Sequence, residues 1–206
     1  MKNTFAFIGA GNMGGAIIEA VCRATEPRNV FVYDRDMVKT AELSAKTGCS
    51  VSASADEATA NAHFVFLCVK PNDLADALKG ICHVLKECLK NSDEKVIVSI
   101  AAGVTKSAIT AILENSGLAL PVIRLMPNTP VAVGKGLILV SPENDVSEED
   151  VALLLNALAP GGLTSLIDEN YIDAATPVFS CSPAYTYMFI EALADGGVMA
   201  GLPRDK

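Results

Sequence analysis

Short apolar runs alternate with longer segments along most of this 206-residue chain. Each apolar run has the length of a buried strand, and each longer segment has room for a helix. The predicted strands are 3–8, 29–33, 64–69, 96–100, 122–125, 136–141 and 164–167, and the predicted helices are 16–23, 38–47, 73–90 and 105–115, with a further helix capped by Ser147 between the last two strands. Strands that alternate with helices predict an α/β fold with a parallel, doubly wound sheet.

A Gly-x-Gly-x-x-Gly motif at residues 9–14 directly follows the first predicted strand. Gly9 allows a tight turn, Gly11 lets the backbone approach a pyrophosphate, and Gly14 lets the next helix sit close to the strand. Asp34 ends the second predicted strand, 20 positions after Gly14, where a carboxylate can hold a ribose hydroxyl. The motif predicts a Rossmann-like, dinucleotide-binding domain. A plain glycine turn between a strand and a helix is the alternative interpretation.

Helices replace the alternating pattern after residue 167, with a short one predicted over 169–175 and a longer one from near Pro183. We therefore predict a dinucleotide-binding domain at 1–167 and the start of a helical substrate or dimerisation domain at 168–206. Three glycines in the last predicted helix each cost about 1 kcal/mol relative to alanine. We expect that helix to pack closely against another backbone, such as that of a second subunit.

Composition and charge narrow the classes of partner. The formal net charge is −8, and eleven acidic residues against two basic ones follow Lys135. We expect no nucleic-acid partner, because phosphate binding needs clustered Lys and Arg. No apolar run approaches the roughly 20 residues that a membrane helix needs. We also recognise no signal peptide, so we expect no membrane partner and a cytoplasmic location.

Cysteine and histidine usage gives little sign of metal or nucleophile chemistry. The six cysteines form no Cys-x-x-Cys pair, and His63 and His83 give no zinc-ligand spacing, so we expect free thiols in a reducing compartment and no metal site. His63 is expected to be structural or exposed, and His83 a surface residue. Cys181 lies between Ser180 and Ser182 without a histidine nearby in sequence, and we interpret it as a small packing residue.

The loops after the predicted strands point to cofactor binding, because strand ends at one edge of such a sheet define the ligand crevice. Three loops, at 69–71, 101–103 and 126–130, contain small, proline or amide residues and no strong acid or nucleophile. This composition suits a flat cofactor ring better than hydrolysis. Lys70 and Asn128 are candidate ligands; a solvated surface lysine and a turn residue are the alternatives.

These motifs together resemble the pyrroline-5-carboxylate reductase family over essentially the whole chain. The resemblance rests on the segments 7–14, 69–71, 99–103, 124–130, 182–185, 191–198 and 201–204. It implies hydride transfer from NADPH or NADH to the C=N carbon of a small cyclic imine, which yields L-proline. A protonated imine is already electrophilic, so the protein needs mainly to orient it in a dry pocket.

The expected site residues fall into two groups, and no catalytic residue is assigned. The predicted cofactor-binding residues are Gly9, Gly11, Asn12, Met13, Gly14, Asp34, Arg35, Val69, Lys70, Pro71, Ala101, Ala102, Gly103 and Asn128, and the substrate-region candidates are Ser182, Pro183 and Glu191. The resemblance places Asn128 near the nicotinamide. Asp34 favours NADH and Arg35 admits NADPH, so the cofactor preference stays open.

The chain departs from the family pattern in two places. Ser180 and Ser182 stand where family members usually carry glycines. Similar enzymes also continue beyond the match to 201–204 into a helical region that builds the dimer and carries a substrate loop, so we expect a fragment or a truncated product here. A homo-oligomer is expected where that region is present.

Two alternative functions remain open. One is a non-catalytic NAD(P)-binding or regulatory protein, which the missing substrate loop favours. The other is a β-hydroxyacid dehydrogenase relative, whose alcohol oxidation needs a proton-accepting lysine on a helix after the sheet. No lysine lies between Lys135 and Lys206, which argues against that second alternative.

Overall fold

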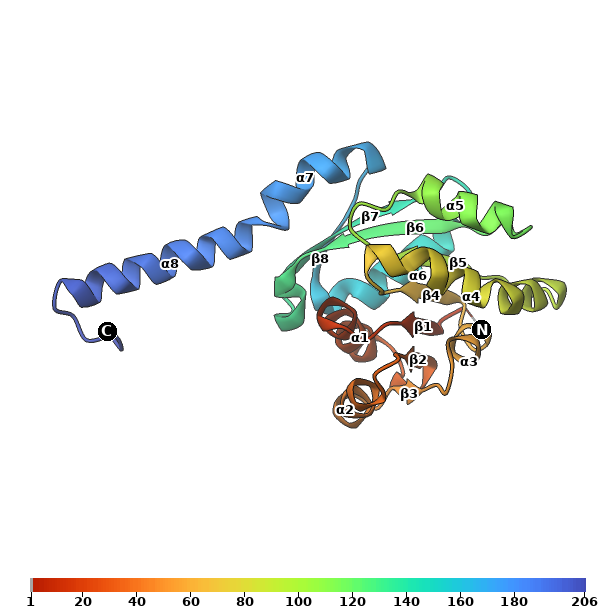
Figure 1. The fold of residues 1–206 in the computed structure, drawn as a ribbon, viewed down its shortest axis with the longest axis horizontal. Helices are drawn as coiled ribbons and strands as arrows, with labels where there is room; N and C mark the ends of the chain where they lie inside the picture. The colour runs from red at the N-terminus through yellow and green to blue at the C-terminus, as the bar shows by residue number, and fades with distance from the viewer. Residues whose placement is uncertain (1) are drawn as a thin grey trace.

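The computed structural model describes residues 2–206 and contains one eight-stranded sheet with helices packed on both faces (Figure 1). The strands are β1 (Phe5–Ile8), β2 (Val30–Tyr33), β3 (Ser50–Val51), β4 (Phe64–Leu67), β5 (Val96–Ser99), β6 (Val122–Pro127), β7 (Gly136–Pro142) and β8 (Gly162–Leu166). The α-helices are α1 (Asn12–Ala24), α2 (Met37–Thr47), α3 (Ala55–Ala60), α4 (Pro71–Lys90), α5 (Lys106–Asn115), α6 (Glu148–Leu158), α7 (Ile172–Phe179) and α8 (Ser182–Met199). Short 3₁₀ turns are η1 (Pro27–Asn29), η2 (Thr129–Val133), η3 (Ala159–Gly161) and η4 (Glu169–Tyr171).

The strands lie in the order β3-β2-β1-β4-β5-β6-β7-β8, which confirms the doubly wound α/β fold. The prediction of a parallel sheet is correct for β1 to β6 and wrong for the last two strands. β7 runs antiparallel to β6, and β8 runs parallel to β7. The connection between β6 and β7 spans only residues 128–135. It is too short for a parallel crossover, which needs a dozen or more residues and usually contains a helix.

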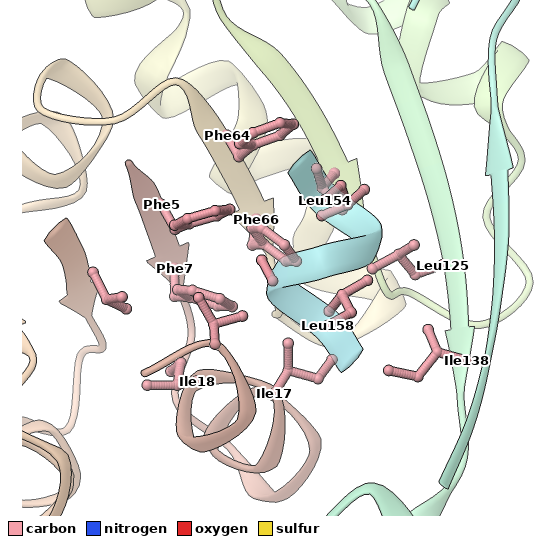
Figure 2. Packing of buried hydrophobic residues seen from close by; sticks show 14 of the residues in the cluster. Phe5, Phe7, Ile17, Ile18, Phe64, Phe66, Leu125, Ile138, Leu154 and Leu158 are labelled. Atoms are coloured by element: carbon pink, nitrogen blue, oxygen red, sulfur yellow. The ribbon is translucent and has the colours of Figure 1, made fainter. Parts of the chain in front are cut away.

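Alternate residues of the central strands build two separate cores. Phe5 and Phe7 of β1 and Phe64 and Phe66 of β4 point to one face, where α1 and α6 cover them (Figure 2). The Phe7 and Phe66 rings stack with centroids 4.3 Å apart. The intervening residues point to the other face, where α4 and α5 supply a second buried cluster. A sheet buried on both faces explains the near-continuous apolar strands in the sequence.

The structure adds two elements that the pattern analysis did not predict, the two-residue β3 and the six-residue α3. α3 begins with a capping box: Ser54 Oγ accepts from the Glu57 amide, and Glu57 Oε2 accepts from the Ala53 amide. The predicted Ser147 cap of α6 is confirmed, since its Oγ accepts from the Asp150 amide at 3.1 Å. All six cysteines are free.

The segment after β8 is helical, as predicted. The long helix begins close to its predicted start near Pro183, whereas the short helix is displaced from its predicted range 169–175. A 3₁₀ turn, η4, takes the place of the first residues of the predicted short helix, and α7 continues to Phe179 despite an internal Pro177. α8 extends away from the sheet and buries none of its residues (Figure 1). Ser180 and Cys181 have ordinary right-handed backbone angles, so the kink between the two helices needs no glycine. In the described residues, no helix is both long and apolar enough to cross a membrane.

His63 is buried and forms a polar pair with Asp150. Of the two expected roles, structural or exposed, the structure confirms the structural one. Its Nε2 lies 2.8 Å from Asp150 Oδ1, and its Nδ1 lies 2.9 Å from the Glu94 carbonyl oxygen, so both ring nitrogens face oxygen atoms. The other Asp150 oxygen accepts from Ser147 Oγ at 2.7 Å. The pair ties the start of α6 to the start of β4.

Asp150→Ala is expected to lower the free energy of unfolding by about 2–3 kcal/mol, because it leaves the buried His63 ring nitrogen and the Ser147 hydroxyl without their carboxylate partner. Urea denaturation measures this change. Glu149→Ala is the matched control, because this neighbouring carboxylate is 67% exposed and pairs with Lys2 at the surface. The control should change stability by no more than about 0.5 kcal/mol. Equal losses in both variants would contradict a special role for the buried pair.

Candidate active site

The glycine loop turns sharply where β1 ends. Gly9 has φ +106°, a conformation that favours glycine, and its amide donates to the Tyr33 carbonyl at 2.8 Å. A Cβ placed on Gly9 would lie 2.7 Å from the Cys68 carbonyl oxygen, so a side chain there would collide with the end of β4. Burial raises the pKa of the neighbouring Cys68 thiol, which keeps it neutral as a packing group.

The other two motif glycines have different roles, and those roles match the predicted spacing. A Cβ on Gly14 would lie 2.7 Å from the Gly9 carbonyl oxygen, so glycine allows α1 to sit close to β1. A Cβ on Gly11 would meet no atom within 4 Å, so the backbone there faces open space. No side chain caps the start of α1, and its first turn holds no acid. Its free amide groups and positive dipole end therefore suit a phosphate group.

Asp34 is fixed at the end of β2 by two backbone amides. Its Oδ2 accepts from Ala10 at 2.7 Å, and its Oδ1 accepts from Asp36 at 2.9 Å. These bonds hold the carboxylate against the glycine loop and leave lone pairs for ribose hydroxyls. Arg35 and Lys39 add positive charge beside it. The Lys39 ammonium also lowers the pKa of the Asp36 carboxyl, whose Oδ2 lies 3.2 Å from Nζ.

A cavity of about 610 Å³ opens between the glycine loop and the ends of β2 and β4. Of the predicted cofactor residues, those that line it are Gly9, Gly11, Asp34, Arg35, Val69 and Lys70. Asn12 lines a neighbouring cavity of about 400 Å³, together with Gly11 and Lys39. The open Gly11 backbone, the uncapped α1 and the fixed Asp34 together fit a dinucleotide.

Sequence reasoning missed several residues of this cavity. Ser54, Ala55 and Asp56 reach it from α3, and Asp73, Asp76 and Ala77 from α4. The Ser54-x-x-Glu57 capping box signals the start of α3 in the sequence. Even so, only the sheet order shows that this start lies beside the end of β2.

The remaining predicted cofactor residues lie at the same sheet edge without lining either cavity. Met13 packs against the core beneath α1, Pro71 begins α4, and Ala101 is buried under α5. Ala102 is exposed and Gly103 makes a turn with φ +75°. Their contact with a cofactor stays a prediction.

Both polar atoms of the Asn128 side chain bond to the protein backbone. Nδ2 donates to the Phe179 carbonyl at 3.0 Å, and Oδ1 accepts from the Leu137 amide at 2.9 Å. The residue is 7% exposed. The structure therefore gives this amide a holding role between β6, β7 and the end of α7, and its proximity to a nicotinamide stays a prediction.

The substrate-region candidates are not brought to the cavity. Ser182 and Pro183 begin α8, where Ser182 Oγ donates to the Val178 carbonyl of α7. Glu191 is exposed on α8 and lies 3.8 Å from the Arg204 guanidinium. Arg204 also pairs with Asp195, and these carboxylates raise the pKa of its guanidinium. Within one chain these groups lie on the projecting helix rather than at the sheet edge.

Two family models match the chain, one at each end. A model described as NADP oxidoreductase coenzyme F420-dependent matches residues 4–103. A model described as pyrroline-5-carboxylate reductase dimerisation matches residues 169–206. Residues 104–168, which include β6, β7 and β8, are matched by neither of these two models.

Full-length comparisons point to the same family. Pyrroline-5-carboxylate reductase from Corynebacterium melassecola is 37% identical over 98% of this chain and 73% of that protein. The enzyme of the same name from Escherichia coli is 36% identical over 99% of this chain and 73% of that protein. The crystal structure of Plasmodium falciparum pyrroline carboxylate reductase with NADP bound aligns with a TM-score of 0.83, at 27% identity over 98% of this chain and 71% of that one. This chain therefore belongs to the pyrroline-5-carboxylate reductase family.

Proposed function

We propose that this protein reduces 1-pyrroline-5-carboxylate to L-proline with NADPH or NADH as the hydride donor. The observation that carries the proposal is the sequence match, at 36–37% identity over nearly the whole chain, to two enzymes named for this reaction. The geometry supports it, because the glycine loop, the open start of α1 and Asp34 form a dinucleotide site at one sheet edge. The predicted division into domains at 1–167 and 168–206 is part of this proposal.

The chain's own residues would mainly bind and orient the reactants. Backbone amides at the start of α1 would hold the diphosphate, and Asp34 a ribose. NADPH or NADH, when bound, supplies the hydride that adds to the imine carbon. Because a protonated imine is already electrophilic, correct orientation and exclusion of water are the main catalytic requirements. The six free cysteines support the cytoplasm as the compartment.

Cofactor preference depends on the charges around the ribose end of the cavity. The Asp34 carboxylate favours ribose hydroxyls and repels a 2′-phosphate. The Arg35 side chain is 85% exposed and lies 3.9 Å from Asp73 Oδ2, so it is free to turn toward an added phosphate. We propose that both cofactors bind and that Arg35 selectively assists NADPH.

We further propose that a second copy of this chain covers α8. Large apolar side chains of this helix are mostly exposed: Tyr185, Tyr187, Met188, Phe189, Ile190 and Leu193. A helix that is apolar around its circumference is normally buried, and an apolar surface of this kind marks an interaction site. The match of residues 169–206 to a dimerisation model supports a homo-oligomer.

Gly11→Asp is expected to abolish turnover of pyrroline-5-carboxylate while the protein stays folded. Aspartate suits a helix N-cap, and nothing lies near the new Cβ, but its charge would repel the diphosphate and weaken NADPH binding about 100-fold. Cofactor absorbance measures turnover, cofactor fluorescence measures binding, and thermal unfolding checks the fold.

Gly11→Asn is the matched control, because asparagine is also a good N-cap and has nearly the same size without the charge. It should lose less affinity than Gly11→Asp. A wild-type chain that binds NADPH but does not consume it with the imine would refute the reductase and support the non-catalytic alternative.

Arg35→Ala should raise the Michaelis constant for NADPH about fivefold, because an exposed charge contact contributes up to about 1 kcal/mol of binding free energy. The Michaelis constant for NADH should stay nearly unchanged. Steady-state rates with each cofactor, at a fixed imine concentration, measure the ratio. Arg23→Ala is a suitable control, because Arg23 is exposed and bonds to the Pro160 carbonyl away from the cavity. An equal effect on both cofactors would contradict recognition of a 2′-phosphate.

Phe189→Asp should convert the oligomer to a monomer, because it places a charge within the apolar surface of α8. Light scattering coupled to gel filtration measures the mass. Leu163→Asp is the control, since Leu163 is equally apolar and 75% exposed, but lies on β8. A monomeric wild-type chain, or loss of the oligomer only in the control, would contradict the proposed interface.

A further inference from the structure

Two alternate residues of β6, and Asn128 directly after it, all reach the η4–α7 segment. Arg124 contacts its start, Met126 packs against its middle, and Asn128 bonds to its end. Alternate residues of a strand point to the same face. The neighbouring β7 contributes Leu139 to the same face, opposite Met126. Together Met126, Leu139 and the fully buried Ile172 of α7 form a small core.

Glu169 of η4 is held by two donors from different elements. Its Oε1 accepts from Arg124 Nη1 at 3.1 Å and from the Lys106 backbone amide at 2.8 Å. The Lys106 amide belongs to the first turn of α5, where the helix dipole favours a negative charge. The Lys106 ammonium is itself tied to β7, where it donates to the Pro142 carbonyl at 2.7 Å and to Ser141 Oγ at 3.2 Å. The Glu169 carboxylate is therefore held by β6 and α5, and the Lys106 side chain links α5 to β7.

Arg124 carries a buried charge, and among residues 2–206 its two acidic partners come from η4 and α7. Its side chain is 3% exposed, and the second partner, Asp173, lies 3.5 Å from Nη2. Arg124 Nε is buried and has no hydrogen-bond partner in this described part of the chain. Burial of a guanidinium with an unpaired N–H costs desolvation free energy, and an apolar side chain of similar size would often give the same or a higher free energy of unfolding. The ion pair is better explained by the single orientation that it imposes.

We propose that Arg124 is a positioning residue for the reductase reaction. Through Glu169 it fixes the angle of η4 and α7 against β6, and so places the start of α8 relative to the cofactor edge. This inference rests on the proposed function. The far end of α7 already meets that edge, because Asn128, in the loop directly after β6, binds the Phe179 carbonyl. Without the Arg124 contact, the segment would turn about the Asn128–Phe179 contact, and this turn would change the direction in which α8 leaves Ser182.

Such a rotation matters for catalysis because hydride transfer is sensitive to small displacements. A shift of about 1 Å in a positioned group can cost about 100-fold in rate. Arg124 lies mid-strand and does not line the dinucleotide cavity. Its loss should therefore affect kcat and leave cofactor affinity unchanged.

The test compares Arg124→Met and Glu169→Gln with the wild-type full chain. Hydrogen exchange of the amides in residues 172–181 reports how firmly α7 is held, without requiring any enzyme activity. We expect this exchange to be about tenfold faster in both variants. We expect kcat to fall about tenfold or more, with the NADPH dissociation constant unchanged.

Two surface variants serve as matched controls. Arg23→Met removes an exposed guanidinium by the same substitution, and Glu87→Gln breaks an exposed pair with Lys90. Neither should alter α7 exchange or kcat. Arg124→Lys, which keeps the charge but not the forked shape, should restore part of the protection. If Arg124→Met fails to fold, Glu169→Gln still tests the contact, because Glu169 is partly exposed and Arg124 stays in place.

Each outcome bears on the inference in one direction. Faster α7 exchange together with a lower kcat and unchanged NADPH binding supports it. Unchanged exchange overturns it, and so does faster exchange with unchanged kcat. If the wild-type chain shows no imine reduction, the proposed function fails, and the exchange data alone then decide whether Arg124 holds α7.

Discussion

The close approach of α1 to the ends of β1 and β4 is the contact on which the rest of the dinucleotide site depends. Gly14 touches the Gly9 carbonyl, and Gly9 in turn lies against the Cys68 carbonyl, with no room for a Cβ at either glycine. This packing places the start of α1, which no side chain caps, at the crevice, where Gly11 faces open space. It also brings the Ala10 amide within bonding distance of Asp34, so that one backbone contact orders both the glycine loop and the Asp34 carboxylate.

β6 has a comparable organising role at the other side of the crevice. Ile123 and Leu125 enter the core beneath α1 and α6, and Arg124 and Met126 face η4 and α7. The antiparallel return of β7 makes this possible, because it sets Ser141 opposite Arg124 and Leu139 opposite Met126 on the same face. One strand thus joins the buried sheet to the helical segment that projects from it.

Local patterns in the sequence predicted most of the fold, because most strands and helices of the sheet domain are marked by their own apolar runs. The glycine motif likewise specified the loop, since Gly9 and Gly14 each leave no room for a Cβ, and Gly11 leaves the space beside the backbone open. The reversal of β7 was missed because it depends on the length of the 128–135 connection rather than on any apolar pattern. The long-range contacts of Asn128, Arg124 and His63 were missed for a different reason. Their partners lie 45 to 87 residues away in the chain, and only the folded sheet brings them together.

The position and the surface of α8 depend on two kinds of interaction, one without a preferred geometry and one with a defined geometry. Apolar burial is strong but has no preferred geometry, so an apolar helix on a loose tether would associate with many surfaces. A charge-assisted bond between a guanidinium and a carboxylate has a defined geometry. The η4–α7 segment connects α8 to the sheet. It is held by such a bond between Arg124 and Glu169 and by the hydrogen bond from Asn128 to the Phe179 carbonyl, and neither contact requires a second chain. Because both contacts lie within one chain, they fix the direction of α8 and restrict which surface of the proposed second copy can pack against it.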